Sequence, residues 1–212
     1  MLQTELIPAT GDRESRRLII VLHGLGDSMD GYRWMPQALP FPWLNFLLVN
    51  APDDYFGGYS WYDFDGDAAR GIERSRRILF ELLDQQDRNG FPTEQTVLFG
   101  FSQGCLMTWE VGLQYPRQLA GLVAISGYVH EPERLLKKKS PVALNQRILS
   151  THGLMDPLIP FEPVQQQVET MKSAGLNVSW HEFAKEHTIA GEDELSVIRT
   201  FIRDCYPPAQ RT

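Results

Sequence analysis

The chain has 212 residues, with a hydrophobic content of 42% and a charged content of 22%, and these ordinary values exclude disordered and fibrous classes. Its formal net charge of −7 argues against nucleic acid as the main partner, because phosphate contacts need clustered Lys and Arg side chains. The single basic run, 137–139, is short, and we interpret it as a solvated loop. We expect one domain over residues 1–212, with a core from about 18 to 205.

Hydropathy and cysteine content indicate the compartment. No window approaches the roughly 18 consecutive apolar residues of a membrane span. The first residues, Met1 to Glu5, do not have the basic-then-apolar layout of a signal peptide. Cys105 and Cys205 lie far apart in the sequence, and we expect two free thiols in a reducing environment. These features predict a soluble, cytoplasmic protein without stable membrane insertion.

Six segments predict β-strands. The first, 18–22, is a continuous run of Leu, Ile and Val, which is typical of a strand covered on both faces in the middle of a parallel sheet. In chain order the predicted strands are 18–22, 43–49, 96–99, 119–126, 147–152 and 178–183.

Helical spacing of apolar residues predicts a helix after most of these strands. The longest pattern covers 67–89; Asp65 or Asp67 can cap its start, and Asn89-Gly90 ends it. The last helix begins with acidic residues 192–194, which the helix dipole favours. This last helix covers 191–205. Further helices are predicted at 31–39, 105–113 and 161–174, and a long polar connection at 127–144. Alternating strands and helices predict an α/β fold, a mostly parallel, doubly wound sheet with helices on both faces.

Residues 100–104 read G-F-S-Q-G between a predicted strand and a predicted helix. Glycines on both sides of Ser102 permit a tight strand-to-helix turn that leaves the hydroxyl exposed. The helix that begins there directs unpaired N–H groups toward the same place, where an oxyanion would be stabilised. The pattern alone also fits an ordinary tight loop, so its meaning depends on the rest of the chain.

Ser102, Asp156 and His187 each follow a predicted strand. The carboxyl ends of parallel strands meet at one edge of the sheet, and the order Ser, Asp, His is the order of the α/β-hydrolase arrangement. We predict that Ser102 is a nucleophile, His187 its general base and Asp156 the acid that orients the imidazole. The predicted oxyanion donors are the backbone N–H groups of Leu25 and Gln103.

The loop at 53–67 is unusually rich in aromatic residues. We expect it to line a pocket or form a lid, because Gly57-Gly58 gives it conformational freedom and it leads toward the active edge of the sheet. Alternatively, Trp61 and Tyr62 pack down and pin the loop to the body of the protein. The residues that we predict to bind substrate are Tyr55, Phe56, Tyr59, Trp61 and Leu158.

The other four histidines have simpler interpretations. His23 and His152 stand next to the loops that carry the predicted site, and we expect them to hydrogen-bond and support those loops. His130 and His181 are given no special role. A zinc site needs several converging ligands, and local His–Asp pairs begin only at His23 and His152, so no metal site is predicted.

Four motifs in the chain resemble those of the acyl-protein thioesterase and carboxylesterase family, also called the phospholipase/carboxylesterase family, of α/β-hydrolases. They are H-G-L-G-D at 23–27, G-F-S-Q-G at 100–104, the stretch 152–160, and His187, within a similarity that extends from about 18 to 201. The resemblance implies a single-domain α/β-hydrolase fold and a Ser-His-Asp esterase or thioesterase without a cofactor. It also implies oxyanion donors at Leu25 and Gln103, and an acyl site lined by the loop after the second strand. Glu186 replaces the glycine that commonly precedes the histidine in this family.

We therefore predict a serine hydrolase that cleaves carboxylic esters or thioesters through an acyl-enzyme. Its expected partner is a small-molecule or lipid-like acyl ester such as a lysophospholipid, with an acylated protein as a further candidate, and the expected state is a monomer or weak homodimer. One alternative is a catalytically silent module of the same fold that binds an apolar ligand or a partner protein through the aromatic loop. A peptidase on the same fold is a third hypothesis.

Overall fold

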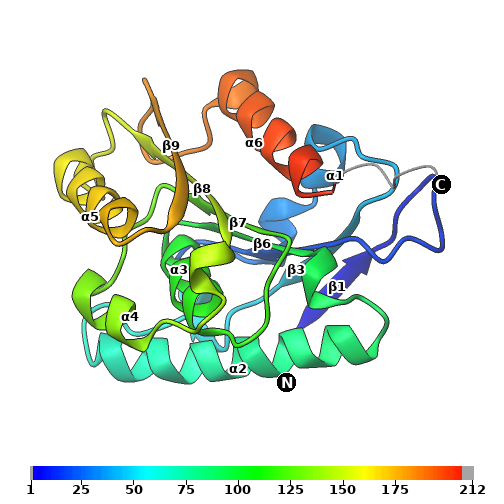
Figure 1. The fold of residues 1–212 in the computed structure, drawn as a ribbon, viewed down its shortest axis with the longest axis horizontal. Helices are drawn as coiled ribbons and strands as arrows, with labels where there is room; N and C mark the ends of the chain where they lie inside the picture. The colour runs from blue at the N-terminus through cyan, green and yellow to red at the C-terminus, as the bar shows by residue number, and fades with distance from the viewer. Residues whose placement is uncertain (1, 207–212) are drawn as a thin grey trace.

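The computed structural model describes residues 2–206 and is organised around a seven-stranded sheet (Figure 1). Its strands are β1 (Thr4–Ile7), β2 (Leu18–Leu22), β3 (Asn45–Val49), β6 (Thr96–Phe101), β7 (Gly121–Ile125), β8 (Arg147–Gly153) and β9 (Asn177–Phe183). Their order across the sheet is β1-β3-β2-β6-β7-β8-β9. β1 pairs antiparallel with β3, and all the other neighbours are parallel. The six predicted strands and the mostly parallel sheet are confirmed.

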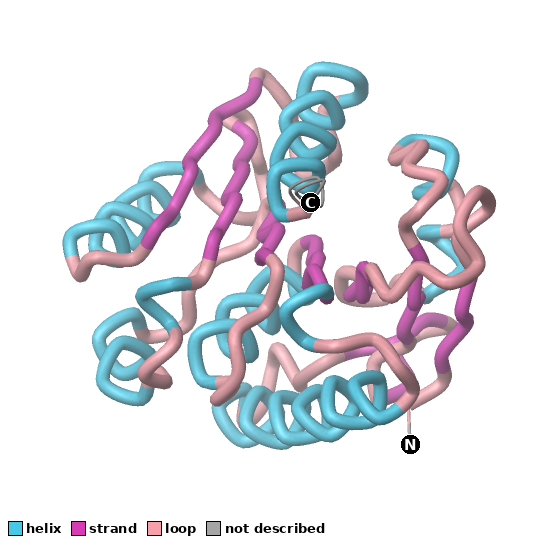
Figure 2. Tube along the Cα trace, turned by 45° about the vertical axis from the view of Figure 1, so that its right-hand side comes forward, coloured by secondary structure: helices cyan, strands magenta, loops and turns pink. Residues whose placement is uncertain are grey.

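Helices cover both faces of the sheet (Figures 1 and 2). They are α1 (Met35–Ala38) and α6 (Gly191–Cys205) on one face, and α2 (Ala68–Arg88), α3 (Gln103–Gln114), α4 (Pro132–Lys138) and α5 (Phe161–Ser173) on the other. In β2, Leu18, Ile20 and Leu22 pack in the core beneath α2 and α3, whereas Ile19 and Val21 pack in the core on the α6 side. No helix within residues 2–206 combines the length and the hydropathy needed to cross a membrane.

The connection predicted at 127–144 contains the short helix α4, so that prediction was wrong. Pro132 suits the first helical position, because its fixed φ and missing N–H cost nothing there. Leu135 is fully buried, and Lys137 and Lys138 occupy the last turn, where the helix dipole favours cations. The lysine run therefore begins on a helix end. A seven-residue helix with one fully buried residue leaves too little periodicity to recognise in the sequence.

Two further differences lie near the N-terminus. The predicted helix at 31–39 is a 3-10 turn, Met29–Tyr32, followed by the four-residue α1, which Pro36 helps to start. The edge strand β1 was not predicted, because its four residues alternate between exposed and half-buried positions and form no apolar run. β1 thus covers the outer edge of β3, and the sheet begins earlier in the chain than expected.

The end of β6 and the start of α3 approach each other so closely that two glycines are required. A β-carbon on Gly100 would lie 2.0 Å from the carbonyl oxygen of Gly104, and one on Gly104 would lie 2.2 Å from the carbonyl oxygen of Leu22. Real β-carbons do not approach backbone atoms so closely. The glycines on either side of Ser102 therefore let α3 pack directly on the ends of β6 and β2.

We expect Gly100→Ala to lower the free energy of unfolding by about 3 kcal/mol or more, because the methyl group meets backbone that cannot move aside. Urea denaturation measures the change. Gly57→Ala is the control: a β-carbon there meets nothing within 4 Å, so only the strain of its positive φ (90°) remains, about 1 kcal/mol. Equal losses in the two variants would contradict the argument.

Candidate active site

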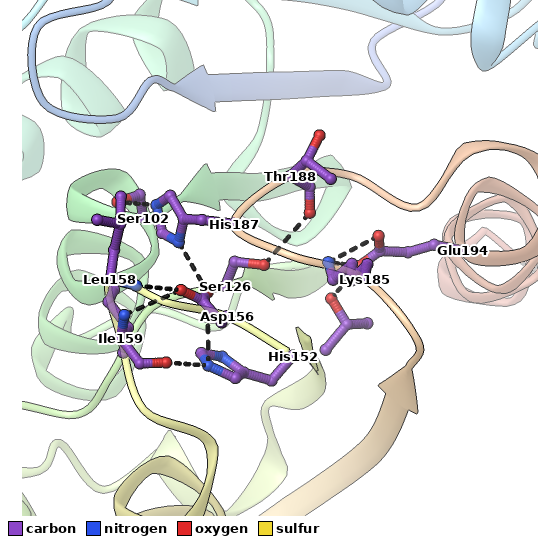
Figure 3. Close-up of polar contacts among 11 residues, drawn as sticks. Ser102, Ser126, His152, Asp156, Leu158, Ile159, Lys185, His187, Thr188 and Glu194 are labelled. Carbon is purple, nitrogen blue, oxygen red and sulfur yellow. Dashed lines mark hydrogen bonds and ion pairs between the residues drawn. The ribbon is translucent and has the colours of Figure 1, made fainter. Parts of the chain in front are cut away.

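The structure brings Ser102, Asp156 and His187 together at the carboxyl edge of the sheet (Figure 3). They follow β6, β8 and β9, respectively. The hydroxyl oxygen of Ser102 lies 2.9 Å from Nε2 of His187, and Nδ1 of His187 lies 2.7 Å from Oδ2 of Asp156. Three side chains far apart in the sequence thus form one continuous hydrogen-bonded chain.

The backbone of Ser102 is strained. Its φ of 55° and ψ of −115° fall outside the regions that L-residues favour, and such a conformation costs on the order of 1–3 kcal/mol. The Ser102 N–H donates to the carbonyl of Ile125 (2.9 Å), and the Ser102 carbonyl accepts from the N–H of Cys105 (3.0 Å). The strand, the sharp turn and the helix together form the arrangement of a nucleophile elbow, in which the hydroxyl stands clear of the sheet.

The carboxylate of Asp156 is buried and held by three donors. Its Oδ1 accepts from the N–H groups of Leu158 (3.0 Å) and Ile159 (2.9 Å), and Oδ2 faces His187. Burial raises the pKa of Asp156, but the hydrogen bonds from Ile159, His187 and Leu158 outweigh it and leave the pKa below its usual value. The charged carboxylate keeps the proton of His187 on Nδ1, so Nε2 presents a lone pair to the Ser102 hydroxyl.

Two buried histidines support the loops around this chain, as predicted. In His23, Nδ1–H donates to the carbonyl of Gly24 (2.6 Å) and Nε2 accepts from the N–H of Ala51 (3.0 Å). In His152, Nε2–H donates to the carbonyl of Ile159 (2.9 Å), within the loop that carries the acid. Burial lowers the pKa of both imidazoles, which therefore remain neutral supports.

Leu25 and Gln103, whose backbone N–H groups are the predicted oxyanion donors, line the same cleft as Ser102. Gln103 is the first residue of α3, where an N–H has no partner inside the helix. Across residues 2–206, neither of these N–H groups donates a hydrogen bond to a protein acceptor. They remain our prediction for the oxyanion donors.

The side chain of Gln103 has a second role that the sequence did not reveal. Its Oε1 accepts from the N–H of Trp61 (2.7 Å), and its Nε2 donates to the carbonyl of Tyr62 (2.9 Å). The indole N–H of Trp61 in turn donates to the carbonyl of His23 (2.9 Å). Residues 61 and 62 are both buried, so the middle of the aromatic loop is pinned to the nucleophile turn.

A cleft of about 470 Å³ opens beside Ser102 and His187. Its apolar walls come from Leu25, Tyr62, Phe64, Phe101, Tyr128, Leu158 and Ile159. Leu158, a predicted substrate residue, lines this cleft, and 71% of its surface is exposed. The other predicted substrate residues lie elsewhere, and the second half of the aromatic loop supplies Tyr62 and Phe64 instead.

The first half of the aromatic loop folds into a hairpin, β4 (Asp53–Tyr55) with β5 (Gly58–Ser60). Phe56 is at its tip and 97% exposed, and the hydroxyl of Tyr59 donates to the side chain of Gln3. Trp61 is fully buried, as the alternative interpretation of the loop expected. The Gly57-Gly58 pair, which we interpreted as flexibility, covers the second residue of the two-residue turn Phe56-Gly57 and the first residue of β5.

No three His, Cys, Asp or Glu side chains in residues 2–206 are grouped so that they could hold a metal ion. Cys105 and Cys205 are free, buried thiols. Burial raises the pKa of both, to about 12 for Cys205, so neither is a thiolate at neutral pH. Ser102 remains our prediction for the nucleophile.

A nucleophile elbow, an acid after β8 and a histidine after β9 on a sheet of this order define an α/β-hydrolase. The model of the phospholipase/carboxylesterase family matches residues 5–206, and the chain belongs to this family.

The chain is also similar to individual proteins of known name and to solved structures. Acyl-protein thioesterase 1 of Schizosaccharomyces pombe is 33% identical over 155 residues, which cover 67% of this chain and 69% of that protein. The Candida albicans protein of the same name is 28% identical and covers 93% of this chain and 95% of its own length. Among solved structures, esterase PE8 has a TM-score of 0.83 at 28% identity, covering 97% of this chain and 99% of that one. Arabidopsis thaliana SOBER1 has a TM-score of 0.80 at 25% identity, covering 89% and 98%.

We expect Gln103→Ala to loosen the aromatic loop while keeping the backbone N–H of residue 103. The N–H of Trp61 loses its buried acceptor, which costs about 1–3 kcal/mol, whereas the carbonyl of Tyr62 keeps the hydroxyl of Ser60 as a donor. Urea denaturation measures the loss, and amide exchange should speed up at residues 61 and 62. Unchanged exchange at these amides would show that the side chain does not anchor the loop.

Proposed function

We propose that this protein is a serine hydrolase that cleaves carboxylic esters or thioesters through an acyl-enzyme on Ser102. The observation that carries the proposal is the hydrogen-bonded chain from the Ser102 hydroxyl through His187 to Asp156, on a strained strand-to-helix turn. Membership of the phospholipase/carboxylesterase family supports the same reaction class. A binding module would have no need for this arrangement.

In the first half of the proposed reaction, Nε2 of His187 accepts the proton of the Ser102 hydroxyl as its oxygen attacks the acyl carbonyl. Asp156 stabilises the imidazolium that forms and does not itself take up the proton. The carbonyl oxygen becomes an oxyanion, which the N–H groups of Leu25 and Gln103 stabilise. His187 then protonates the leaving alcohol or thiol, and the acyl group remains bonded to Ser102.

In the second half, a water molecule takes the place of the leaving group. His187 removes one of its protons as the water oxygen attacks the acyl-enzyme, and the proton returns to Ser102 when the acid leaves. No cofactor enters the proposed scheme.

The two halves of the substrate suit different clefts. The acyl group is bonded to Ser102 in the intermediate, so it belongs in the apolar cleft that Ser102 lines. A second cleft, of about 420 Å³, borders His187 but not Ser102, and its walls include Tyr32, Trp34 and Leu195. We assign the leaving group to this second cleft, because the departing atom must lie within reach of Nε2 of His187.

Among the substrates open to such an enzyme, we favour acyl chains of lipid type carried by a protein or a lysophospholipid. The apolar walls of the Ser102 cleft and the exposed side chain of Leu158 at its edge suit a hydrocarbon chain. Relatives with the name acyl-protein thioesterase support the protein-borne form. The proposed compartment is the cytoplasm, which the two free thiols support.

Replacing Ser102 or His187 with Ala should lower kcat by about 10⁴-fold or more with little change in Tm, because the nucleophile or its base is removed. Hydrolysis of aryl esters and thioesters measures kcat, and a fluorophosphonate should label Ser102 in the unmodified protein only. Full activity in either variant would refute the mechanism. Absence of labelling, together with absence of ester turnover, would instead favour a binding module.

The assignment of the clefts predicts separable effects. Leu158→Ala should lower kcat/KM about tenfold for long acyl chains, with little change for acetyl esters, because it removes apolar contact with the chain. Trp34→Ala should lower kcat/KM by a similar factor for esters of bulky aromatic alcohols, without altering the rate of deacylation. Pre-steady-state release of the alcohol separates the two steps. Loss of long-chain preference in Trp34→Ala would reverse the assignment.

A further inference from the structure

A buried ion pair lies beside the proposed catalytic chain and has no part in its chemistry. Nζ of Lys185 is 2.7 Å and 2.8 Å from the two carboxylate oxygens of Glu194 (Figure 3). The exposed fraction is 4% for Lys185 and 0% for Glu194. Removing two charges from water is unfavourable, and buried pairs are often replaceable by apolar residues without loss of stability. Stability of the fold alone therefore does not explain why Lys185 and Glu194 form a buried ion pair here.

The carboxylate of Glu194 also accepts hydrogen bonds from two donors outside the ion pair. Besides Lys185, it accepts hydrogen bonds from the backbone N–H of Ala190 and from the hydroxyl of Thr151. Lys185 and Ala190 stand on either side of His187 in the sequence, and Thr151 belongs to β8. One side chain on the first turn of α6 thus holds both ends of the histidine loop, residues 184–190, against β8.

The backbone of Lys185 ties the histidine loop to the loop of the acid. Its carbonyl accepts from the N–H of Met155 (3.1 Å), next to Asp156. A β-carbon on Gly153 would lie 2.4 Å from the same carbonyl, so the two loops are in direct contact. The loop that carries His187 is therefore in contact with the loop that carries Asp156 through the backbone of Lys185.

We propose that Glu194 and Lys185 are positioning residues, which hold the histidine loop so that His187 meets Asp156 on one side and Ser102 on the other. This inference rests on the proposed serine-hydrolase function. Apolar side chains could fill the same volume, but they could not accept the hydrogen bonds of Ala190 and Thr151. The charged pair thus fixes the conformation of the histidine loop, which an apolar pair could not do.

The test compares four variants with the unmodified protein. Glu194→Gln removes the charge, and the double variant Lys185→Met with Glu194→Met removes the pair without leaving an unpaired buried charge. Thr151→Val removes one hydrogen bond and keeps the pair. Glu110→Gln is the matched control: Glu110 is also buried and bonded to Arg134 and Gln114, but it lies on α3 away from the histidine loop.

We expect Glu194→Gln and the double variant to lower kcat about 100-fold with KM nearly unchanged, because a displacement of about 1 Å at the base has an effect of that size. In the double variant Tm should recover toward that of the unmodified protein while kcat stays low. Thr151→Val should lower kcat about fivefold, because a change of this size matches the net contribution of one hydrogen bond. Glu110→Gln should keep its kcat.

A proton NMR signal gives a readout independent of turnover. The Nδ1–H of His187, bonded to Asp156, should give a far-downfield resonance in the unmodified protein and in Glu110→Gln, and it should broaden or move in Glu194→Gln. Normal kcat in the folded double variant, or recovery of kcat together with Tm, would overturn the inference. If Glu194→Gln and the double variant do not fold, normal kcat and an unchanged resonance in Thr151→Val would overturn it.

The same experiments keep the two proposals apart. An unmodified protein that neither hydrolyses esters nor takes up a fluorophosphonate refutes the serine-hydrolase function. The downfield resonance still reports whether Glu194 fixes the contact between His187 and Asp156. Conversely, an active unmodified protein with insensitive variants refutes the positioning role alone.

Discussion

The close packing of α3 on the ends of β2 and β6 is the constraint on which the rest of the site depends. It forces the backbone of Ser102 into a conformation that an isolated peptide would rarely adopt, and the surrounding glycines make that conformation possible. Because α3 begins at the next residue, the hydroxyl and the free N–H of Gln103 have a fixed relation to each other. In the proposed reaction, the nucleophile and one oxyanion donor thus lie on one rigid turn, which needs no rearrangement when a substrate arrives.

The remaining parts of the site are attached to this turn by hydrogen bonds from loops. Asp156 is fixed by the amides of its own loop, and the histidine loop is bonded both to that loop and to α6. Gln103 holds the aromatic loop from the other side. The scaffold is therefore rigid at the strand ends, and the precision of the loops comes from buried polar contacts.

The sequence predicted the elements whose signal is local and repeated. Continuous apolar runs located the buried strands, and the rule that parallel strands end at one edge brought Ser102, Asp156 and His187 together. Hydrogen bonds between side chains and backbone groups that are distant in the sequence have no local pattern from which they could be predicted. The bond from Gln103 to Trp61 spans 42 residues, and Glu194, expected only as an acidic residue suited to a helix start, turns inward to Lys185. Of the six aromatic residues in one loop, Tyr62 and Phe64 line the cleft, and both lie after the hairpin, which the composition of the loop does not indicate.

The aromatic loop divides at Tyr62 into a part that is anchored and a part that is not. Residues 60–62 are hydrogen-bonded to the side chain of Gln103, whereas residues 63–67 are exposed and include Phe64 on the wall of the cleft. Insertions or substitutions after Tyr62 can therefore reshape the cleft that we assign to the acyl chain, while the contacts among Ser102, His187 and Asp156 stay intact. Related proteins can therefore differ in substrate range through residues 63–67 while they keep the same arrangement of Ser102, His187 and Asp156.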